Sequence, residues 1–317
     1  MIIDPHMHCR DGKQAYKETI GHVFKIADEQ GVNKIFDMPN TNPPILFEKD
    51  VKARLKLVPK KRKNDYYLYI GLTADKKQLK EAIKCYNKYR EVAGFKLYAG
   101  KSVGNLAIIK EKEQKEIYKI LSDFNYKGVL AVHCEKEKFL KPKLWNPLKP
   151  ITHSYARPKQ AEIESIKDQI KFVRETNFKG ILHICHVSCP ESVKLIDQAR
   201  KEMKITCGVT PHHILWSNEI LKKPDGLLYT TNPPLRNNED VKKLRKYLKD
   251  GKIDWIETDH APHAINEKLF SPYLSGYPSL YLYKNFVEKF LPSIGLSKKQ
   301  IKKITFENIY KTFKFKL

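Results

Sequence analysis

Two histidines and an arginine stand at alternate positions near the start of the chain, as His6, His8 and Arg10. Side chains of an extended strand alternate between faces, so these three project to one side and Met7 and Cys9 to the other. Two imidazoles on one face can bind a Zn²⁺-like ion. A guanidinium beside them can hold an anionic group through paired hydrogen bonds. Two histidines alone are weak support for a metal site, so the rest of the chain must supply further ligands.

Further side chains that bind metals or transfer protons lie in or just after short apolar segments: Lys96, His133, His186 and Asp259. Taken singly, each has a structural explanation, such as a core histidine, half of an ion pair or a helix cap. In a (β/α)8 barrel, however, catalytic groups lie at the carboxyl ends of the strands, and all of these residues would share that end. The sequence therefore predicts one site. His183 is an alternative candidate to His186 in the same segment. Both faces of a buried strand are apolar, so periodicity cannot show which of the two histidines points toward the site.

Short apolar segments alternate with longer amphipathic ones along the whole chain. Eight strands separated by helices predict an α/β fold, a (β/α)8 TIM barrel, rather than an open doubly wound sheet. The absence of a G-x-G-x-x-G motif also disfavours the open sheet. The expected strands are residues 1–8, 32–38, 66–72, 94–98, 129–134, 181–187, 205–209 and 253–258. The expected helices are residues 16–30, 47–57, 76–92, 111–124, 159–176, 190–203 and 238–249.

No low-complexity linker divides the chain, so residues 1–317 are expected to form a single barrel domain with a helical tail at about 297–317. Residues 135–158 and 210–237 are expected to be long loops. Residues 99–105 follow Lys96 and contain two glycines. This segment is either a lid over the substrate or an ordinary connection.

The composition, with 41% hydrophobic and 30% charged residues, is typical of a globular protein. No apolar run has the length of a membrane span, and the first residues do not resemble a signal peptide. The six cysteines form no C-x-x-C pair, which predicts reduced thiols in the cytoplasm. Three of them, Cys9, Cys134 and Cys185, adjoin candidate histidines and are expected to face the helices as small apolar side chains.

The net charge is +24, and it comes mostly from lysines spread along helical segments. Arginine-rich base readers and zinc-finger spacings are missing, so we expect no nucleic-acid partner. The charge can still attract anionic metabolites.

The candidate residues lie in a series of short motifs. In chain order these are residues 6–12 (HMHCRDG), 38–44 (MPNTNPP), 96–98 (KLY), 132–135 (VHCE), 157–158 (RP), 161–162 (AE), 186–188 (HVS), 232–236 (NPPLR) and 258–263 (TDHAPH). Over nearly the whole chain this series resembles the dihydroorotase family of the amidohydrolase superfamily. Related allantoinases and hydantoinases generally lack an arginine at the position of Arg10, which favours a substrate with a carboxylate. Only five residues precede His6, so the resemblance is to a compact form without a β-sandwich subdomain.

The resemblance implies a centre of two zinc ions. Lys96, carboxylated on its amine, would bridge the ions, because an ammonium beside two dications is unfavourable whereas a carbamate is an anionic ligand. The match to the HVS motif selects His186 over His183. The implied ligands are His6, His8 and Asp259 for one ion, and His133 and His186 for the other.

The resemblance also implies a reaction, the reversible cyclisation of N-carbamoyl-L-aspartate to L-dihydroorotate in pyrimidine biosynthesis. A hydroxide that bridges the ions would attack the ring amide, and Asp259 would act as the general acid and base. The implied substrate contacts are Arg10, Asn40 and His263 for the carboxylate, and the backbone near Asn232 and Tyr277 for the ring amide edges.

Two other functions stay open. One is another cyclic-amide hydrolase, such as an allantoinase or a hydantoinase (dihydropyrimidinase). The other is a non-catalytic dihydroorotase-like scaffold for aspartate transcarbamoylase, although such proteins usually lose ligands and all six are present here. Some motifs resemble the compact dihydroorotases and others the longer type. The sequence therefore leaves open the subclass, a homodimer and an association with aspartate transcarbamoylase.

Overall fold

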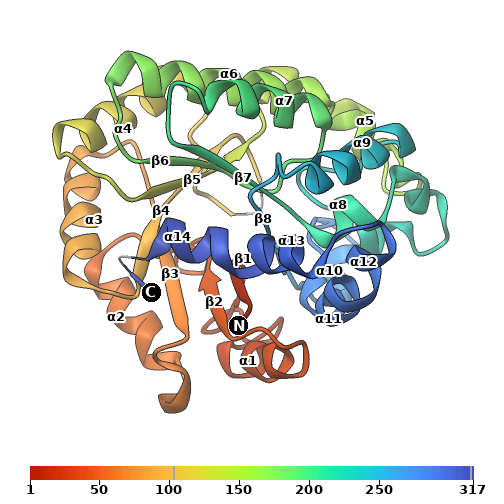
Figure 1. Ribbon diagram of the computed structural model, residues 1–317, viewed down its shortest axis with the longest axis horizontal. Coiled ribbons are helices and arrows are strands. Elements are labelled where there is room, and N and C mark those ends of the chain that lie inside the picture. Colours follow the sequence, from red (N-terminus) through yellow and green to blue (C-terminus); the bar gives the residue numbers. More distant parts are fainter. Residues whose placement is uncertain (103, 315) are drawn as a thin grey trace.

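The computed structural model describes residues 1–102, 104–314 and 316–317. Val103, in the 99–105 segment, and Phe315, in the expected tail, lie outside the described residues. The centre is one sheet of eight parallel strands in sequence order, surrounded by helices (Figure 1). This arrangement confirms the predicted (β/α)8 barrel. The strands are β1 (Ile3–Met7), β2 (Lys34–Asp37), β3 (Tyr66–Gly71), β4 (Val92–Ala99), β5 (Val129–Cys134), β6 (Ile181–Ile184), β7 (Ile205–Val209) and β8 (Trp255–Ile256).

Each of the seven predicted helices is present, with ends shifted by at most four residues. Outward-facing strand residues such as Leu68 and Leu130 pack against the helices in one large apolar core. Inward-facing residues such as Phe36 and Tyr69 form a smaller cluster inside the barrel. None of the described helices combines the length and apolarity that crossing a bilayer requires. The seven are α1 (Ile20–Glu29), α2 (Glu48–Leu57), α3 (Lys76–Lys88), α4 (Glu111–Asp123), α6 (Lys159–Thr176), α7 (Pro190–Ala199) and α9 (Asn238–Lys249).

Shorter helices occupy the connections and the C-terminal part. The two segments expected as long loops contain α5 and α8, each beside short 3-10 turns. A single helical turn is too short to give a periodic apolar pattern, which is why the sequence did not indicate these elements. The short helices are α5 (Thr152–Ala156), α8 (Pro211–Leu215), α10 (Ile265–Leu269), α11 (Tyr283–Asn285), α12 (Leu291–Ser293), α13 (Lys298–Lys302) and α14 (Asn308–Phe313).

The last strand is much shorter than the predicted 253–258, and irregular backbone completes the barrel. Asp259 has a φ of +46°, so the chain leaves strand geometry there. Its backbone N–H donates to the carbonyl of His6 at 2.9 Å, and the N–H of His8 donates to the carbonyl of His260 at 2.8 Å. These hydrogen bonds join the first and last strands, so the sheet forms a nearly closed barrel.

The C-terminal helices cover the amino end of the barrel, with α13 and α14 joined by a π-helical turn at Lys303–Glu307. Helix α14 crosses the barrel in Figure 1. The ring centroid of Phe313, in α14, lies 4.9 Å from that of Phe36, 6.4 Å from Tyr69 and 6.2 Å from Trp255. Since these three partners point into the barrel, Phe313 fills its amino end with an aromatic ring.

Phe313→Ala should lower the free energy of unfolding by about 3–5 kcal/mol, because truncation of a buried aromatic ring leaves a cavity. Urea denaturation measures this change. Tyr310→Ala in the same helix is the matched control, since its side chain is 48% exposed. The control should cost about 0.5 kcal/mol or less. Equal losses in the two variants would show that α14 does not contribute to the core through Phe313.

Candidate active site

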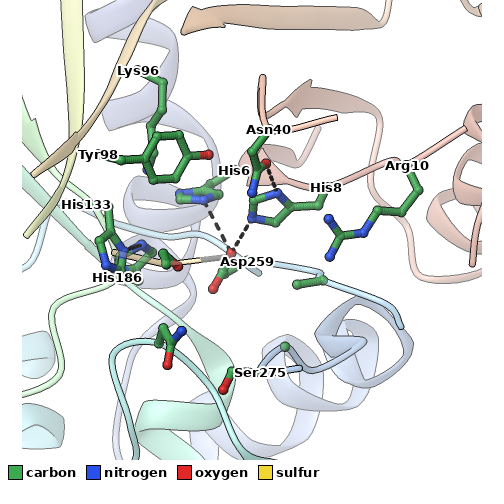
Figure 2. Close-up of a pocket in the computed structure, with 14 residues that line it drawn as sticks. His6, His8, Arg10, Asn40, Lys96, Tyr98, His133, His186, Asp259 and Ser275 are labelled. Atoms are coloured by element: carbon green, nitrogen blue, oxygen red, sulfur yellow. Dashed lines mark hydrogen bonds and ion pairs between the residues drawn. The ribbon is translucent and has the colours of Figure 1, made fainter. Parts of the chain in front are cut away.

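Nine of the eleven predicted site residues line one cavity at the carboxyl ends of the strands (Figure 2). They reach it from the ends of several strands, which a barrel brings to the same face. The side chains of His263 and Tyr277 do not belong to this lining. The nine residues are His6, His8, Arg10, Asn40, Lys96, His133, His186, Asn232 and Asp259.

One group of ligand atoms gathers around Asp259. Its Oδ1 lies 3.3 Å from His6 Nε2 and 2.9 Å from His8 Nε2. The three donor atoms all lie within 4.8 Å of one another. On its far side, His8 Nδ1 is 2.7 Å from Oδ1 of Asn40. An amide oxygen only accepts hydrogen bonds, so Nδ1 carries the proton and Nε2 keeps its lone pair for an ion.

Two members of this group, Asp259 and His8, have pKa values that suit binding of a dication. Burial opposes ionisation of Asp259, but the neighbouring His6 and His8 imidazoles outweigh it and hold the pKa of the carboxyl well below its usual range. Burial lowers the pKa of His8 to about 4. An ionised carboxylate beside a neutral imidazole is the form in which both side chains bind metal.

His133 and His186 form a second, adjoining group. His133 Nδ1 lies 3.3 Å from His186 Nε2, and the His186 ring centroid is 5.2 Å from that of His6. Burial lowers the pKa of His186 well below its ordinary value, so this ring is neutral. Its Nδ1 has no hydrogen-bond partner among the residues that the structure describes. Imidazole nitrogens this close to each other are suited to share an ion.

Lys96 extends from the inner face of β4 into the same cavity and is 1% exposed. Its Nζ lies 3.1 Å from Cys185 Sγ, and no carboxylate within the described residues forms an ion pair with it. Burial opposes ionisation of the Cys185 thiol, but the neighbouring Lys96 and His6 side chains outweigh it and lower the pKa of the thiol to about 5.

The structure corrects the prediction for Cys185. Cys9 and Cys134 face the helices as expected, but Cys185 points into the barrel toward Lys96. The error came from counting strand alternation backward from His186. That residue has a φ of +37°, so it leaves the strand pattern, and β6 ends at Ile184 instead of residue 187.

His183 and His186 occupy different positions, because His183 lies deeper in the barrel. Its Nε2 is 2.9 Å from Glu257 Oε2, and its ring stacks on Trp255 with centroids 4.4 Å apart. His183 does not line the cavity, whereas His186 does.

Arg10 is a cation beside these ligand groups, with a side chain that is 2% exposed. Its Nε donates to the carbonyl of Pro262 at 3.0 Å, and its Nη2 lies 3.2 Å from His263 Nε2. His263 therefore stands behind the guanidinium, and its Nε2 also lies 3.2 Å from the carbonyl oxygen of Ser275. Burial lowers the pKa of Arg10, and no carboxylate of the described chain forms an ion pair with it. An anionic group in the cavity would complete the charge balance.

The remaining predicted contacts differ in position. Asn232 lines the cavity, and its Oδ1 lies 3.1 Å from His153 Nε2. The Tyr277 ring lies instead against Tyr229, with centroids 5.6 Å apart. Its neighbour Gly276 lines the cavity. On this side, therefore, Gly276 bounds the cavity and Tyr277 does not.

Sequence reasoning missed several lining residues. Tyr98 follows Lys96 by two positions in β4, so strand alternation alone could have identified it. Ser275 and Gly276 come from an irregular connection after α10, where no periodic pattern predicts position. The missed lining residues are Tyr98, Ser102, Ala261, Ser275 and Gly276.

Curated archaeal dihydroorotases are similar to this chain in sequence, although no protein-family profile matches it. The chain is 34% identical over 269 residues to the Pyrococcus furiosus dihydroorotase, covering 84% of this chain and 55% of the relative. It is 31% identical over 277 residues to that of Methanosphaera stadtmanae, covering 84% and 59%. It is 31% identical over 301 residues to that of Aeropyrum pernix, covering 94% and 66%. The chain thus spans between 55% and 66% of the length of these relatives.

Solved hydantoinases share the fold. An L-hydantoinase from Arthrobacter aurescens gives a TM-score of 0.85 at 22% identity, covering 99% of this chain and 70% of the other. A D-hydantoinase from a Thermus species gives 0.82 at 21% identity, covering 98% and 70%. At identities this low, the structural similarity shows a shared fold and nothing more. The sequence relatives are closer, and by its identity of 31–34% to them along at least 84% of its length, the chain belongs to the dihydroorotase family of the amidohydrolase superfamily.

Proposed function

We propose that this protein is a dihydroorotase that interconverts N-carbamoyl-L-aspartate and L-dihydroorotate in pyrimidine biosynthesis. The observation that carries the proposal is the buried Arg10 guanidinium beside two groups of metal-binding side chains. A neutral cyclic amide would leave this charge uncompensated, whereas dihydroorotate brings a carboxylate. The dihydroorotases among the sequence relatives support the same assignment.

Two zinc ions fit the donor set. His6, His8 and Asp259 would hold one ion, and His133 and His186 the other. Imidazole nitrogens and carboxylate oxygens are ligands that zinc prefers. The donor atoms of His6, His8 and Asp259 lie within 4.8 Å of one another, and a nitrogen of His133 lies 3.3 Å from one of His186. When bound, two such ions lower the pKa of a shared water and polarise a carbonyl oxygen.

Lys96 would join the two ions as a carbamate. Its Nζ lies in the same cavity and contacts a thiol instead of a carboxylate. Dications nearby favour the neutral amine over the ammonium. Capture of carbon dioxide converts that amine into an anion with two ligand oxygens.

Asp259 would move the proton. Its Oδ1 contacts both imidazoles, which leaves Oδ2 for proton transfer. In ring opening the carboxylate accepts a proton from the attacking water and delivers it to the ring nitrogen as the carbon–nitrogen bond breaks. In ring closure the same steps run in reverse and release water.

Arg10 would bind the substrate carboxylate through two parallel hydrogen bonds, with Asn40 and His263 beside it. Asn232 and the backbone next to Tyr277 would meet the amide edges of the ring. These contacts orient the ring so that its scissile carbonyl faces the metal-binding side chains.

A hydantoinase-type activity is the second candidate, because solved hydantoinases share the fold. A hydantoin ring lacks the carboxylate that Arg10 is placed to bind. Turnover of dihydroorotate, hydantoin and allantoin by the purified protein separates the candidates. Faster turnover of hydantoin or allantoin would overturn the proposed function.

The purified protein should contain about two zinc ions per chain, as expected of a two-metal hydrolase. His186→Ala should reduce the content to about one, because it removes one of two imidazoles from the second group. Mass spectrometric metal analysis gives these ratios. His22→Ala removes a histidine of α1, outside the cavity, and should retain both ions. Full occupancy in His186→Ala would contradict the ligand assignment.

Lys96→Ala should abolish activity, since no anion then joins the two ligand groups. Short carboxylic acids such as acetate should restore part of the activity by occupying the vacated space, and should leave the wild type unchanged. Activity assays with increasing acid concentration measure the rescue. Carbon NMR of the active wild type in isotope-labelled bicarbonate should show the carbamate. Its absence from active, metal-loaded enzyme would refute this role of Lys96.

Arg10→Met should weaken transition-state stabilisation for dihydroorotate by about 2–5 kcal/mol, the usual cost of removing one partner of a buried charge pair. Turnover of dihydrouracil, which lacks the carboxylate, should be slow in the wild type and little changed. The measurement is kcat/KM for both rings, with metal content as a check. Lys13→Met, which removes an exposed positive charge nearby, is the control. Equal losses on both rings would mean that Arg10 supports the fold instead of binding the substrate.

A further inference from the structure

Glu257 is a buried carboxylate beneath the cavity that the reaction steps above do not use. It lies two residues before Asp259 and is 0% exposed. Its two oxygens face polar groups from three different strands or strand ends. Two of those groups belong to His6 and His186, which are proposed zinc ligands.

The first contact is with His6. Oε1 of Glu257 lies 3.7 Å from His6 Nδ1, which has no hydrogen-bond partner among the described residues. A carboxylate at this place attracts the proton to Nδ1. The other ring nitrogen, Nε2, is the one that faces Asp259.

The second contact is with the backbone of His186, whose N–H donates to Oε1 of Glu257 at 2.5 Å. His186 has a φ of +37°, a conformation that is unfavourable for a residue with a side chain. The charge-assisted hydrogen bond stabilises this turn of the chain. The turn is what directs the His186 ring toward His133.

Other residues fix Glu257 itself. His183 Nε2 lies 2.9 Å from Oε2, and Trp255 Nε1 donates to the same oxygen at 3.0 Å. The carboxylate also occupies space that a side chain at Gly208 would need. A Cβ at Gly208 would lie 2.4 Å from the carboxyl carbon of Glu257. The Glu257 carboxylate can therefore occupy this position only because residue 208 in β7 has no side chain.

We infer that Glu257 is a positioning residue that orients one ligand from each proposed zinc site, His6 and His186. Groups that contact metal-binding residues from outside the ligand set fix the orientation of those residues. Glu257 does so through a charge 3.7 Å from the His6 ring and a hydrogen bond from the His186 backbone. The inference rests on the proposed metal centre, and it does not depend on which ring the enzyme opens.

Glu257→Gln keeps the shape of the side chain and removes its charge. Titration of the zinc-loaded protein with a chromophoric chelator should show zinc bound about 10–100-fold more weakly than in the wild type. Glu162→Gln is the matched control. Glu162 is equally buried and contacts Ser188 and Ser192 but none of the proposed ligands. The control should retain wild-type zinc affinity even if its melting temperature falls.

Gly208→Ala tests the same contact without changing any charge, and it covers the case in which Glu257→Gln does not fold. The added methyl group must displace the carboxylate, so zinc affinity should again fall while Glu257 is intact. Wild-type affinity in either folded variant would overturn the inference alone. A wild-type protein that binds no zinc would overturn the proposed function as well.

Discussion

The site depends on the junction of the first and last strands. Because β8 is only two residues long, backbone hydrogen bonds between residues 6–8 and 259–260 close the barrel in its place. The same bonds fix the distance between the His6 and His8 rings and the Asp259 carboxylate. The hydrogen bonds that close the barrel therefore also bring His6, His8 and Asp259 together.

A buried ion pair supports this junction from the outer side of β1. Asp37 accepts a hydrogen bond from the backbone N–H of Cys9 at 2.9 Å and pairs with Arg54 at 2.6 Å. Since both charges are buried, removing either one would leave the other uncompensated. The anchored backbone lies between His8 and Arg10, so helix α2 is coupled to two residues that line the cavity.

Periodicity was sufficient to predict most of the architecture, because every strand that is buried on both faces gives an apolar run and every covering helix gives an amphipathic one. It failed where the backbone leaves regular geometry. The positive φ of His186 reversed the expected side of Cys185, and β8 has two residues where six were expected. Glu257 was also missed, because a single acidic residue in an apolar segment gives no sign of its partners. Those partners come from strands that only the closed barrel brings together.

The order of the ligands along the chain has a consequence for biosynthesis. His8 and Asp259 are 251 residues apart in the chain, yet His8 Nε2 lies 2.9 Å from Asp259 Oδ1. A chain still emerging from the ribosome exposes His6 and His8 long before the carboxylate that completes their group exists. In the proposed metal centre, the first ligand group can therefore be complete only after residue 259 has been translated. An interrupted polypeptide would carry an incomplete set of these ligands.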